Sequence, residues 1–182
     1  MKKKKTNLIL IVGTSGSGKT HMSHYLDYEW GIPFIVSYTT RDKREGETDG
    51  VDHHFINHRM YENADKNEML AYTKFGDNHY FTMKWQTEVY PTYSYVVDED
   101  GVRFFLERYA DEYNIIPVYV HASEETRRAR GIDQARIDRD SQRQHLPLNM
   151  YMSVINNDSS CDEFLHAIDE FLHKANEKYY FL

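Results

Sequence analysis

Apolar residues along the chain form short continuous runs that alternate with stretches in which they recur at helical spacing. Four runs, at residues 8–12, 34–36, 93–98 and 115–120, predict strands. Helical spacing follows the first and third of these runs, as shown by Met22, Tyr25 and Leu26 and then by Val102, Phe105, Leu106 and Tyr109. The pattern therefore predicts one helix after residue 19 and another over 102–113.

Weaker patterns complete this prediction. Residues around Met60 and Ala64 favour a short helix, 83–89 favours another, and Ser123 before two glutamates is a plausible helix start. The stretch 160–163 has the pattern of a capping box, which predicts a closing helix. One face of that helix carries Phe164, Leu165, Ile168, Phe171 and Leu172. Residues 37–55 hold too many glycines and charges to predict regular structure.

Composition narrows the class of protein. A chain of 182 residues, 40% hydrophobic and 28% charged, is typical of one globular domain that could carry inserted lobes. A net charge of -7 argues against a nucleic-acid polymer as partner. Cys161 is the only cysteine, which excludes an internal disulfide and fits a reducing compartment. We expect a cytoplasmic protein without a membrane span, in which the lysines at 2–5 form a solvated tail.

The stretch 13–20 reads G-T-S-G-S-G-K-T and lies between a predicted strand and a predicted helix. This context makes it a phosphate-binding loop, because glycines let main-chain N–H groups approach a polyphosphate closely. Lys19 can reach the β- and γ-phosphates, and the Thr20 hydroxyl can bind magnesium. The loop residues predicted to bind are Gly13, Ser15, Gly16, Ser17, Gly18, Lys19 and Thr20. The alternative is a glycine-rich turn that binds nothing.

Hydroxyl groups and arginines are concentrated at the start of the polar stretch 37–55. Guanidinium forks match phosphate oxygens two at a time, although composition alone equally describes a polar surface loop. The stretch reads S-Y-T-T-R-D-K-R-E-G-E-T-D-G-V-D-H-H-F. Together with the loop at 13–20, it resembles the guanylate kinase family, and the similarity continues at lower density through most of the chain.

This resemblance implies an α/β P-loop kinase fold in a single domain. The core would be a parallel five-stranded sheet flanked by helices, formed by about residues 6–36 and 92–182. A small acceptor-nucleotide lobe would span about 37–91, and a mobile lid about 127–145. The cofactors implied are ATP and Mg²⁺.

The resemblance also implies how the acceptor nucleotide is held. Arg41 and Arg44 would grip its phosphate, and Ser37 would lie close to it. His53 stands where the family has a tyrosine, so phosphate affinity could depend on pH. Tyr80 and Thr82 match a tyrosine and a hydroxyl that help to hold the phosphate and the base.

Ala71 is the main departure from the family, which carries a glutamate there that accepts hydrogen bonds from guanine. Losing this contact leaves the guanine donors unpaired, which costs about 1–3 kcal/mol of binding free energy for each buried group. Either another acid such as Glu68 or Asp100 covers the base edge, or the preferred base is not guanine. Phe81, which replaces a glycine of the family, favours the second option by adding bulk close to the acceptor. An alignment slip that hides a compensating glutamate is the further alternative.

Asp98 and Asp100 resemble two acids of the family that follow a core strand. A carboxylate at the carboxyl end of a parallel strand lies beside a phosphate loop, so Asp98 could bind the magnesium shell or a hydroxyl. Asp100 would contact the base. Without the resemblance, the stretch 98–101 would be interpreted as an acidic turn.

Six arginines lie between 127 and 143, which is a high density for an acidic chain. The segment resembles the family's lid, with Arg130 as the first lid arginine and Arg139, or its rival Arg136, as the second. Such residues could stabilise the charge on a migrating phosphoryl group. The alternative is a solvated helix in which acids at 133, 138 and 140 pair with the arginines, and we expect this for Arg128 and Arg143. Asn156 matches a turn that borders the donor's adenine.

The function hypothesis is therefore an ATP- and Mg²⁺-dependent kinase that phosphorylates a nucleoside monophosphate, with GMP or dGMP as the first candidate. The nearest rival keeps the chemistry but acts on another base, a modified base or a deoxynucleotide. A second rival is a non-catalytic guanylate-kinase-like interaction module, against which the intact Lys19 and Thr20 argue. A third, a simple ATPase or a kinase for another acceptor, is disfavoured by Arg41 and Arg44. We expect a monomer or homodimer without structural zinc.

Overall fold

The computed structural model describes residues 5–180, so most of the lysine tail at 2–5 lies outside the described residues. The chain divides into two compact units. The core unit consists of residues 5–34 and 91–180, and the inserted unit consists of residues 35–90. No helix within the described range is long and apolar enough to cross a membrane.

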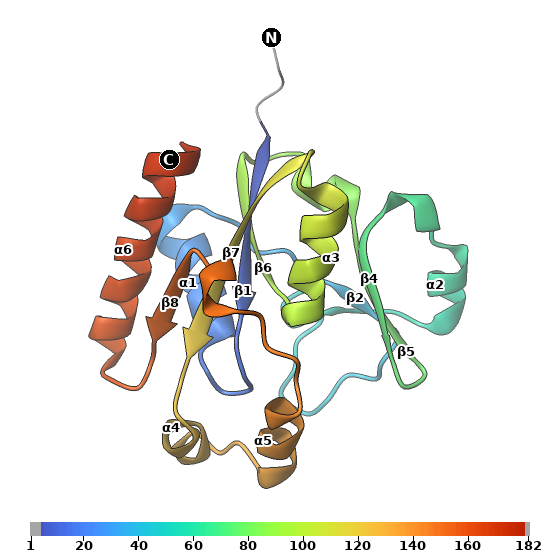
Figure 1. Cartoon of the computed structure of the whole chain (residues 1–182). Coiled ribbons are helices and arrows are strands. Elements are labelled where there is room, and N and C mark those ends of the chain that lie inside the picture. The colour runs from blue at the N-terminus through green and yellow to red at the C-terminus, as the bar shows by residue number, and fades with distance from the viewer. Residues whose placement is uncertain (1–4, 181–182) are drawn as a thin grey trace. The chain divides into compact units, whose positions relative to one another are not determined.

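A parallel sheet with the strand order β6-β1-β7-β8 forms the centre of the core unit (Figure 1). Its strands are β1 (Thr6–Val12), β6 (Thr92–Val96), β7 (Tyr113–His121) and β8 (Ser153–Asn156). The helices of this unit are α1 (Lys19–Trp30), α3 (Glu99–Tyr109), α4 (Glu124–Ala129), α5 (Gln134–Ser141) and α6 (Cys161–Tyr179), and a 3₁₀ helix spans Leu148–Met150. This arrangement confirms the expected α/β class.

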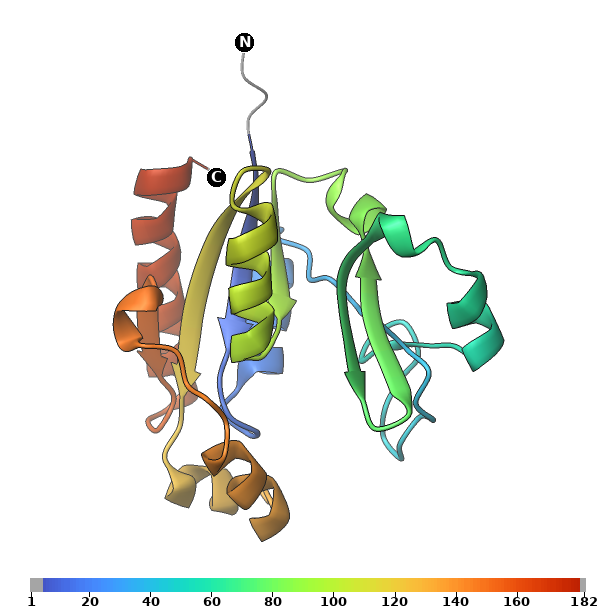
Figure 2. The ribbon, with the colours of Figure 1, turned by 45° about the vertical axis from the view of Figure 1, so that its right-hand side comes forward.

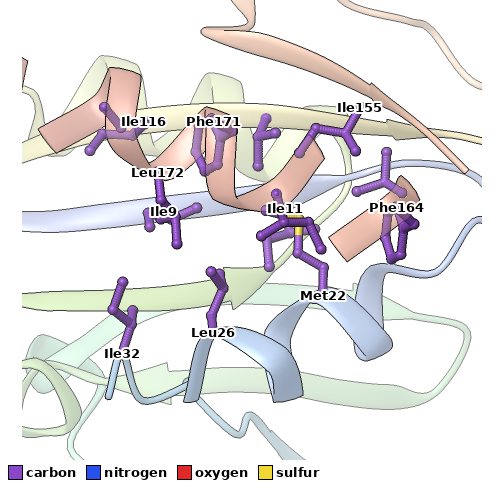
Figure 3. Packing of buried hydrophobic residues seen from close by; sticks show 14 residues of the cluster. Ile9, Ile11, Met22, Leu26, Ile32, Ile116, Ile155, Phe164, Phe171 and Leu172 are labelled. Carbon is purple, nitrogen blue, oxygen red and sulfur yellow. The ribbon is translucent and has the colours of Figure 1, made fainter. Parts of the chain in front are cut away.

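Helices cover both faces of this sheet, which is why residues 7–12 of β1 are all buried. On one face, Ile9 and Ile11 pack against α1 and α6 (Figure 3). Figures 1 and 2 show α3 on the opposite face from α1. Each fully buried large apolar side chain in this core contributes about 1.5–3 kcal/mol to folding. Sheet and helices therefore form a rigid support for the loops at the carboxyl ends of the strands.

The inserted unit contains a second sheet with the strand order β3-β2-β5-β4. Its strands are β2 (Tyr38–Thr39), β3 (His54–Phe55), β4 (Met69–Phe75) and β5 (Asn78–Met83). Helix α2 (His58–Asn63) and the 3₁₀ helices Lys66–Glu68 and Lys84–Thr87 complete it. The stretch 37–55, expected to lack regular structure, thus contributes two short strands.

Three predicted elements differ from the structure. Residues 34–36 form a single bridge from Phe34 to Ser94 instead of a fifth core strand. The preceding Pro33 accepts a hydrogen bond from the Ser94 N–H but has no N–H of its own to extend a ladder. Residues 83–89 give the end of β5 and a 3₁₀ helix instead of an α-helix, and the helix predicted over 102–113 begins and ends earlier, at 99–109.

Candidate active site

The loop at 13–20 joins β1 to α1, as its sequence predicts. Gly18 is the N-cap residue of α1, with a φ of +106°, so Lys19 and Thr20 lie in the first helical turn. A Cβ atom on Gly18 would collide with Nδ2 of Asn157, and one on Gly16 would meet Ile132. The loop thus needs glycine at both positions, and it lies at the positive end of a helix.

Lys19 is held inside this loop. Its Nζ donates a hydrogen bond of 2.8 Å to the carbonyl oxygen of Thr14. Burial, together with the nearby positive charge of Arg143, lowers the pKa of Lys19 to about 8, although Asp140 and Glu99 partly offset this. The ammonium group is therefore poorly solvated, and an anion beside it would favour its charged form.

A pocket of about 420 Å³ opens beside the loop in the core unit. Its lining includes Gly16, Gly18, Lys19, Thr20, His21, Arg130, Asn157, Ser159, Cys161 and Phe164. The Thr20 hydroxyl is a hard oxygen donor in this lining, which fits one ligand of a magnesium ion that also binds phosphate oxygens and water. The pocket thus combines N–H groups, cations and an oxygen donor, as a nucleoside polyphosphate site requires.

Arg130 and Asn157 attach the predicted lid segment to this loop. Arg130 donates to the carbonyl oxygen of Gly16 at 2.9 Å and to both oxygens of Asn157. Asn157 is buried and donates through Nδ2 to the carbonyl oxygen of Ser17 at 2.8 Å. Asn156, predicted to border the adenine, is exposed at the end of β8, so the residue that contacts the loop is its neighbour.

The acidic stretch after β6 begins a helix instead of forming a free turn. Asp98 is the N-cap of α3 and accepts a hydrogen bond of 2.8 Å from the N–H of Gly101, while Asp100 is exposed and pairs with Arg103. Glu99, between them, is buried and contacts His145 at 3.0 Å. The structure thus places neither Asp98 nor Asp100 among the residues that line the pocket.

Residues of the predicted lid segment form a cluster of charged side chains around a buried carboxylate, against the loop. Arg127 is buried and donates through Nε to the carbonyl oxygen of Ser15 at 2.9 Å. Arg139 donates to the hydroxyl of Ser15, also at 2.9 Å. Asp140 is 1% exposed and pairs with Arg127, Arg139 and Arg143. The solvated-helix interpretation is therefore wrong for Asp140 and for Arg143, whose side chain is 29% exposed. It describes Arg128, which pairs with Glu124 in solvent.

In the inserted unit, the structure brings together Ser37, Arg41, His53 and Tyr80. The Ser37 hydroxyl contacts Nδ1 of His53 at 2.8 Å. Glu47 accepts two hydrogen bonds of 2.8 Å from Arg41. This contact raises the pKa of Arg41, with a smaller contribution from Tyr80. Burial and then the charge of Arg41 lower the pKa of His53, which favours the neutral imidazole.

One face of the second sheet carries the predicted base-binding residues. Ala71 lies opposite Thr82, and Tyr80 is two residues along β5 on the same face. The Thr82 hydroxyl is buried and has no hydrogen-bond partner among the described residues. Phe81 points to the opposite face, where it stacks on Tyr38, so its side chain does not share the face of Ala71 and Thr82. The Arg44 side chain is exposed.

The sequence reasoning missed three residues that contact the loop, Arg127, Asp140 and Asn157, and one whose charge acts on Lys19, Glu99. Only Asp140 carries a partial signal in the sequence. It follows Ile137, the buried apolar residue of α5, by three positions, which places both on one helix face but does not distinguish a buried carboxylate from an exposed one. For the others the partner is remote in sequence, as with Asn157 and Ser17, so no local pattern marks them.

Sequence comparisons with known proteins find relatives that are named as guanylate kinases. The family model described as guanylate kinase matches residues 5–175. The chain is 31% identical over 134 residues to the guanylate kinase of Aromatoleum aromaticum, covering 69% of this chain and 66% of that protein. It is 31% identical over 139 residues to the guanylate kinase of Cupriavidus metallidurans, covering 72% of this chain and 64% of that protein.

Other matches are shorter or more distant in sequence. The guanylate kinase of Histophilus somni is 40% identical over 81 residues, which cover 42% of this chain and 39% of that protein. The chain therefore spans less than two thirds of the length of these three relatives. A solved guanylate kinase structure from Anaplasma phagocytophilum aligns with a TM-score of 0.66 at 18% identity, over 97% of this chain and 88% of that one. That structural match concerns the fold.

Proposed function

Because the chain belongs to the guanylate kinase family, we propose that it transfers the γ-phosphoryl group of ATP to a nucleoside monophosphate. GMP and dGMP are the first candidate acceptors. The observation that carries the proposal is the loop at 13–20, where Lys19, the N-terminus of α1 and a pocket of about 420 Å³ meet. A loop of this form has no evident use in a protein that only binds a partner.

On the donor side, Lys19 and the loop N–H groups other than those of Ser15 and Ser17, which donate to Asp140 and to the carbonyl oxygen of Thr14, bind the β- and γ-phosphates. Thr20 provides an oxygen ligand for Mg²⁺, which when bound neutralises the charge between those phosphates. Arg130, already attached to the loop carbonyl of Gly16, extends the positive surface of the pocket. The Asp98 carboxylate could join the magnesium shell only through an oxygen not used by its cap.

On the acceptor side, Arg41, Arg44, Ser37, His53 and Tyr80 hold the monophosphate. The contact between Glu47 and Arg41 supports this role, because a guanidinium fixed by a carboxylate needs little further ordering when it meets a phosphate. The unpartnered hydroxyl of Thr82 supports a ligand on the same face, since buried hydroxyls are rarely left without a partner.

We further propose that residues 37–91 act as the acceptor lobe and 127–145 as the lid, with Arg130 and Arg139 reaching the transferring group. Catalysis would then come from positioning two polyanions and neutralising the charge between them, without a covalent intermediate. Exclusion of water by the lid would keep ATP hydrolysis slow.

Ala71 favours a second candidate, a kinase for another or a modified base. A methyl group on the face that carries Thr82 cannot accept the hydrogen bonds that guanine offers. The two candidates differ only in the base.

Initial rates of ADP formation with a panel of ribo- and deoxynucleoside monophosphates test the proposal. Turnover with at least one acceptor, far above ATP hydrolysis alone, is the expected result. A strong GMP preference would exclude the second candidate, and no ADP with any acceptor would refute the kinase function altogether.

A further inference from the structure

Asp140 is a buried carboxylate. It lies in the predicted lid segment, whose sequence is also compatible with a solvated helix. Its Oδ2 accepts hydrogen bonds from the N–H of Ser15 at 2.6 Å and from Arg127 at 3.0 Å. Its Oδ1 faces Arg139 at 3.3 Å and Arg143 at 3.4 Å. Burial alone would raise its pKa, but the hydrogen bonds from Ser15 and the arginines outweigh that effect and lower it. The carboxylate is therefore ionised and fully surrounded by donors.

All these contacts converge on one residue of the phosphate loop. Ser15 donates its N–H to Asp140, accepts from Arg127 through its carbonyl oxygen, and accepts from Arg139 through its hydroxyl. These bonds link the loop to residues more than 110 positions away in the sequence. The lid segment is thus fixed to the loop at Ser15 through α4 and α5.

Three guanidinium groups gathered around one point would repel one another and Lys19. Arg143 and Arg127 both lower the pKa of Lys19, whereas Asp140 raises it. Asp140 is the carboxylate that contacts all three arginines, so it offsets the repulsion that their assembly creates.

Building on the kinase function proposed above, we propose that Asp140 is a positioning residue that holds Arg127, Arg139 and Arg143 against the phosphate loop. It acts through these arginines, which then stabilise the charge on the transferring phosphoryl group. Asp140 itself does not contact the nucleotide.

The first test compares Asp140→Asn with Asp138→Asn, an exposed acid on the same helix. Asparagine has nearly the same shape but lacks the charge. We expect kcat to fall about 10- to 100-fold in Asp140→Asn, with the acceptor KM changed by less than about twofold because the acceptor residues lie in the other unit. Asp138→Asn should match the wild type. An unchanged kcat, or tighter ATP binding without loss of kcat, would overturn the inference, because Asp140 would then be inert or a competitor of phosphate.

A double-mutant cycle with Arg139→Gln separates positioning from a general structural effect. If Asp140 acts through Arg139, the loss of kcat caused by Arg139→Gln should be several-fold smaller in the Asp140→Asn background. Fully additive losses with Arg139→Gln, Arg127→Gln and Arg143→Gln would contradict the inference. If Asp140→Asn does not fold, Asp140→Glu keeps the charge and displaces the carboxylate by one methylene. Its kcat should fall about tenfold relative to Asp138→Glu, and equal values would overturn the inference.

Limited proteolysis tests the same contact without turnover. Trypsin cleaves after arginine, so cleavage after Arg136, Arg139 and Arg143, mapped by mass spectrometry without nucleotide, reports how firmly α5 is held. We expect about a tenfold faster cleavage at these sites in Asp140→Asn than in Asp138→Asn. Equal rates would refute the positioning role. A wild type that lacks kinase activity but shows this difference would refute the proposed function alone.

Discussion

Replacing Glu47 with glutamine tests whether a fixed Arg41 is what holds the acceptor phosphate. The Arg41 and Glu47 side chains are only 11% and 19% exposed, and two hydrogen bonds of 2.8 Å join them. The contact with Arg41 is the main cause that lowers the pKa of Glu47 from 4.5 to about 2. Glutamine keeps one acceptor oxygen but loses the charge, so we expect the free energy of unfolding to fall by about 1–3 kcal/mol.

The same substitution should weaken acceptor binding. If about 1.4 kcal/mol of the interaction free energy lost between Glu47 and Arg41 also weakens acceptor binding, the acceptor KM rises about tenfold. The KM for ATP should stay the same. Steady-state kinetics with each substrate varied in turn measures both constants. The matched control is Glu45→Gln, which removes an exposed acid from the same loop. An acceptor KM equal to that of the wild type, despite the loss of stability, would refute the role given to Arg41.

Acidification gives an independent check with a definite sign. The folded-state pKa of Glu47 is depressed, so its stabilising contribution is fully present above about pH 4.5 and is lost as the pH falls toward 2. In urea titrations, the stability difference between wild type and Glu47→Gln should therefore be constant from pH 7 to 5 and shrink below that. A difference that grows on acidification would show that the ion pair has been misassigned.

Three further substitutions probe the rest of the site. Lys19→Ala should lower kcat at least about 100-fold with an unchanged circular dichroism spectrum, because it removes the cation of the loop; full activity would mean that the loop does not bind the donor. Asn157→Ala removes a buried side chain that bonds Ser17 and Arg130 and should raise the KM for ATP about 5- to 100-fold; an effect confined to the acceptor KM would contradict its placement. Ala71→Glu should raise kcat/KM for GMP by a similar factor if the missing carboxylate loosens guanine recognition, and no change would refute that explanation.

Much of the core could be predicted from the sequence, because its elements are encoded by local patterns. The run at 8–12, the glycines after it and the capping box at 160–163 each define their own conformation, and the structure confirms all three. The predictions of secondary structure failed where an adjacent residue or a pairing partner determines the conformation. The run at 34–36 is apolar enough for a strand, but Pro33 and a single bridge to Ser94 limit its pairing.

The electrostatic part of the site could not be predicted in the same way. Acids and arginines in residues 127–143 are spaced as in a solvated helix, so sequence alone does not distinguish an exposed ion pair from the buried Asp140 cluster. The deciding partner is Ser15, 125 residues away. The side on which Phe81 lies likewise depends on the register of β5 against β4, which composition does not reveal.

The central claim is that an anion site on the core unit and another on the inserted unit serve a single phosphoryl transfer. Binding of a bisubstrate compound, adenosine and guanosine joined through five phosphates, tests this most directly by calorimetry. The account predicts a Kd at least about 100-fold below that of ATP, weakened by both Lys19→Ala and Arg41→Gln. A Kd no lower than that of ATP, and insensitive to Arg41→Gln, would contradict it.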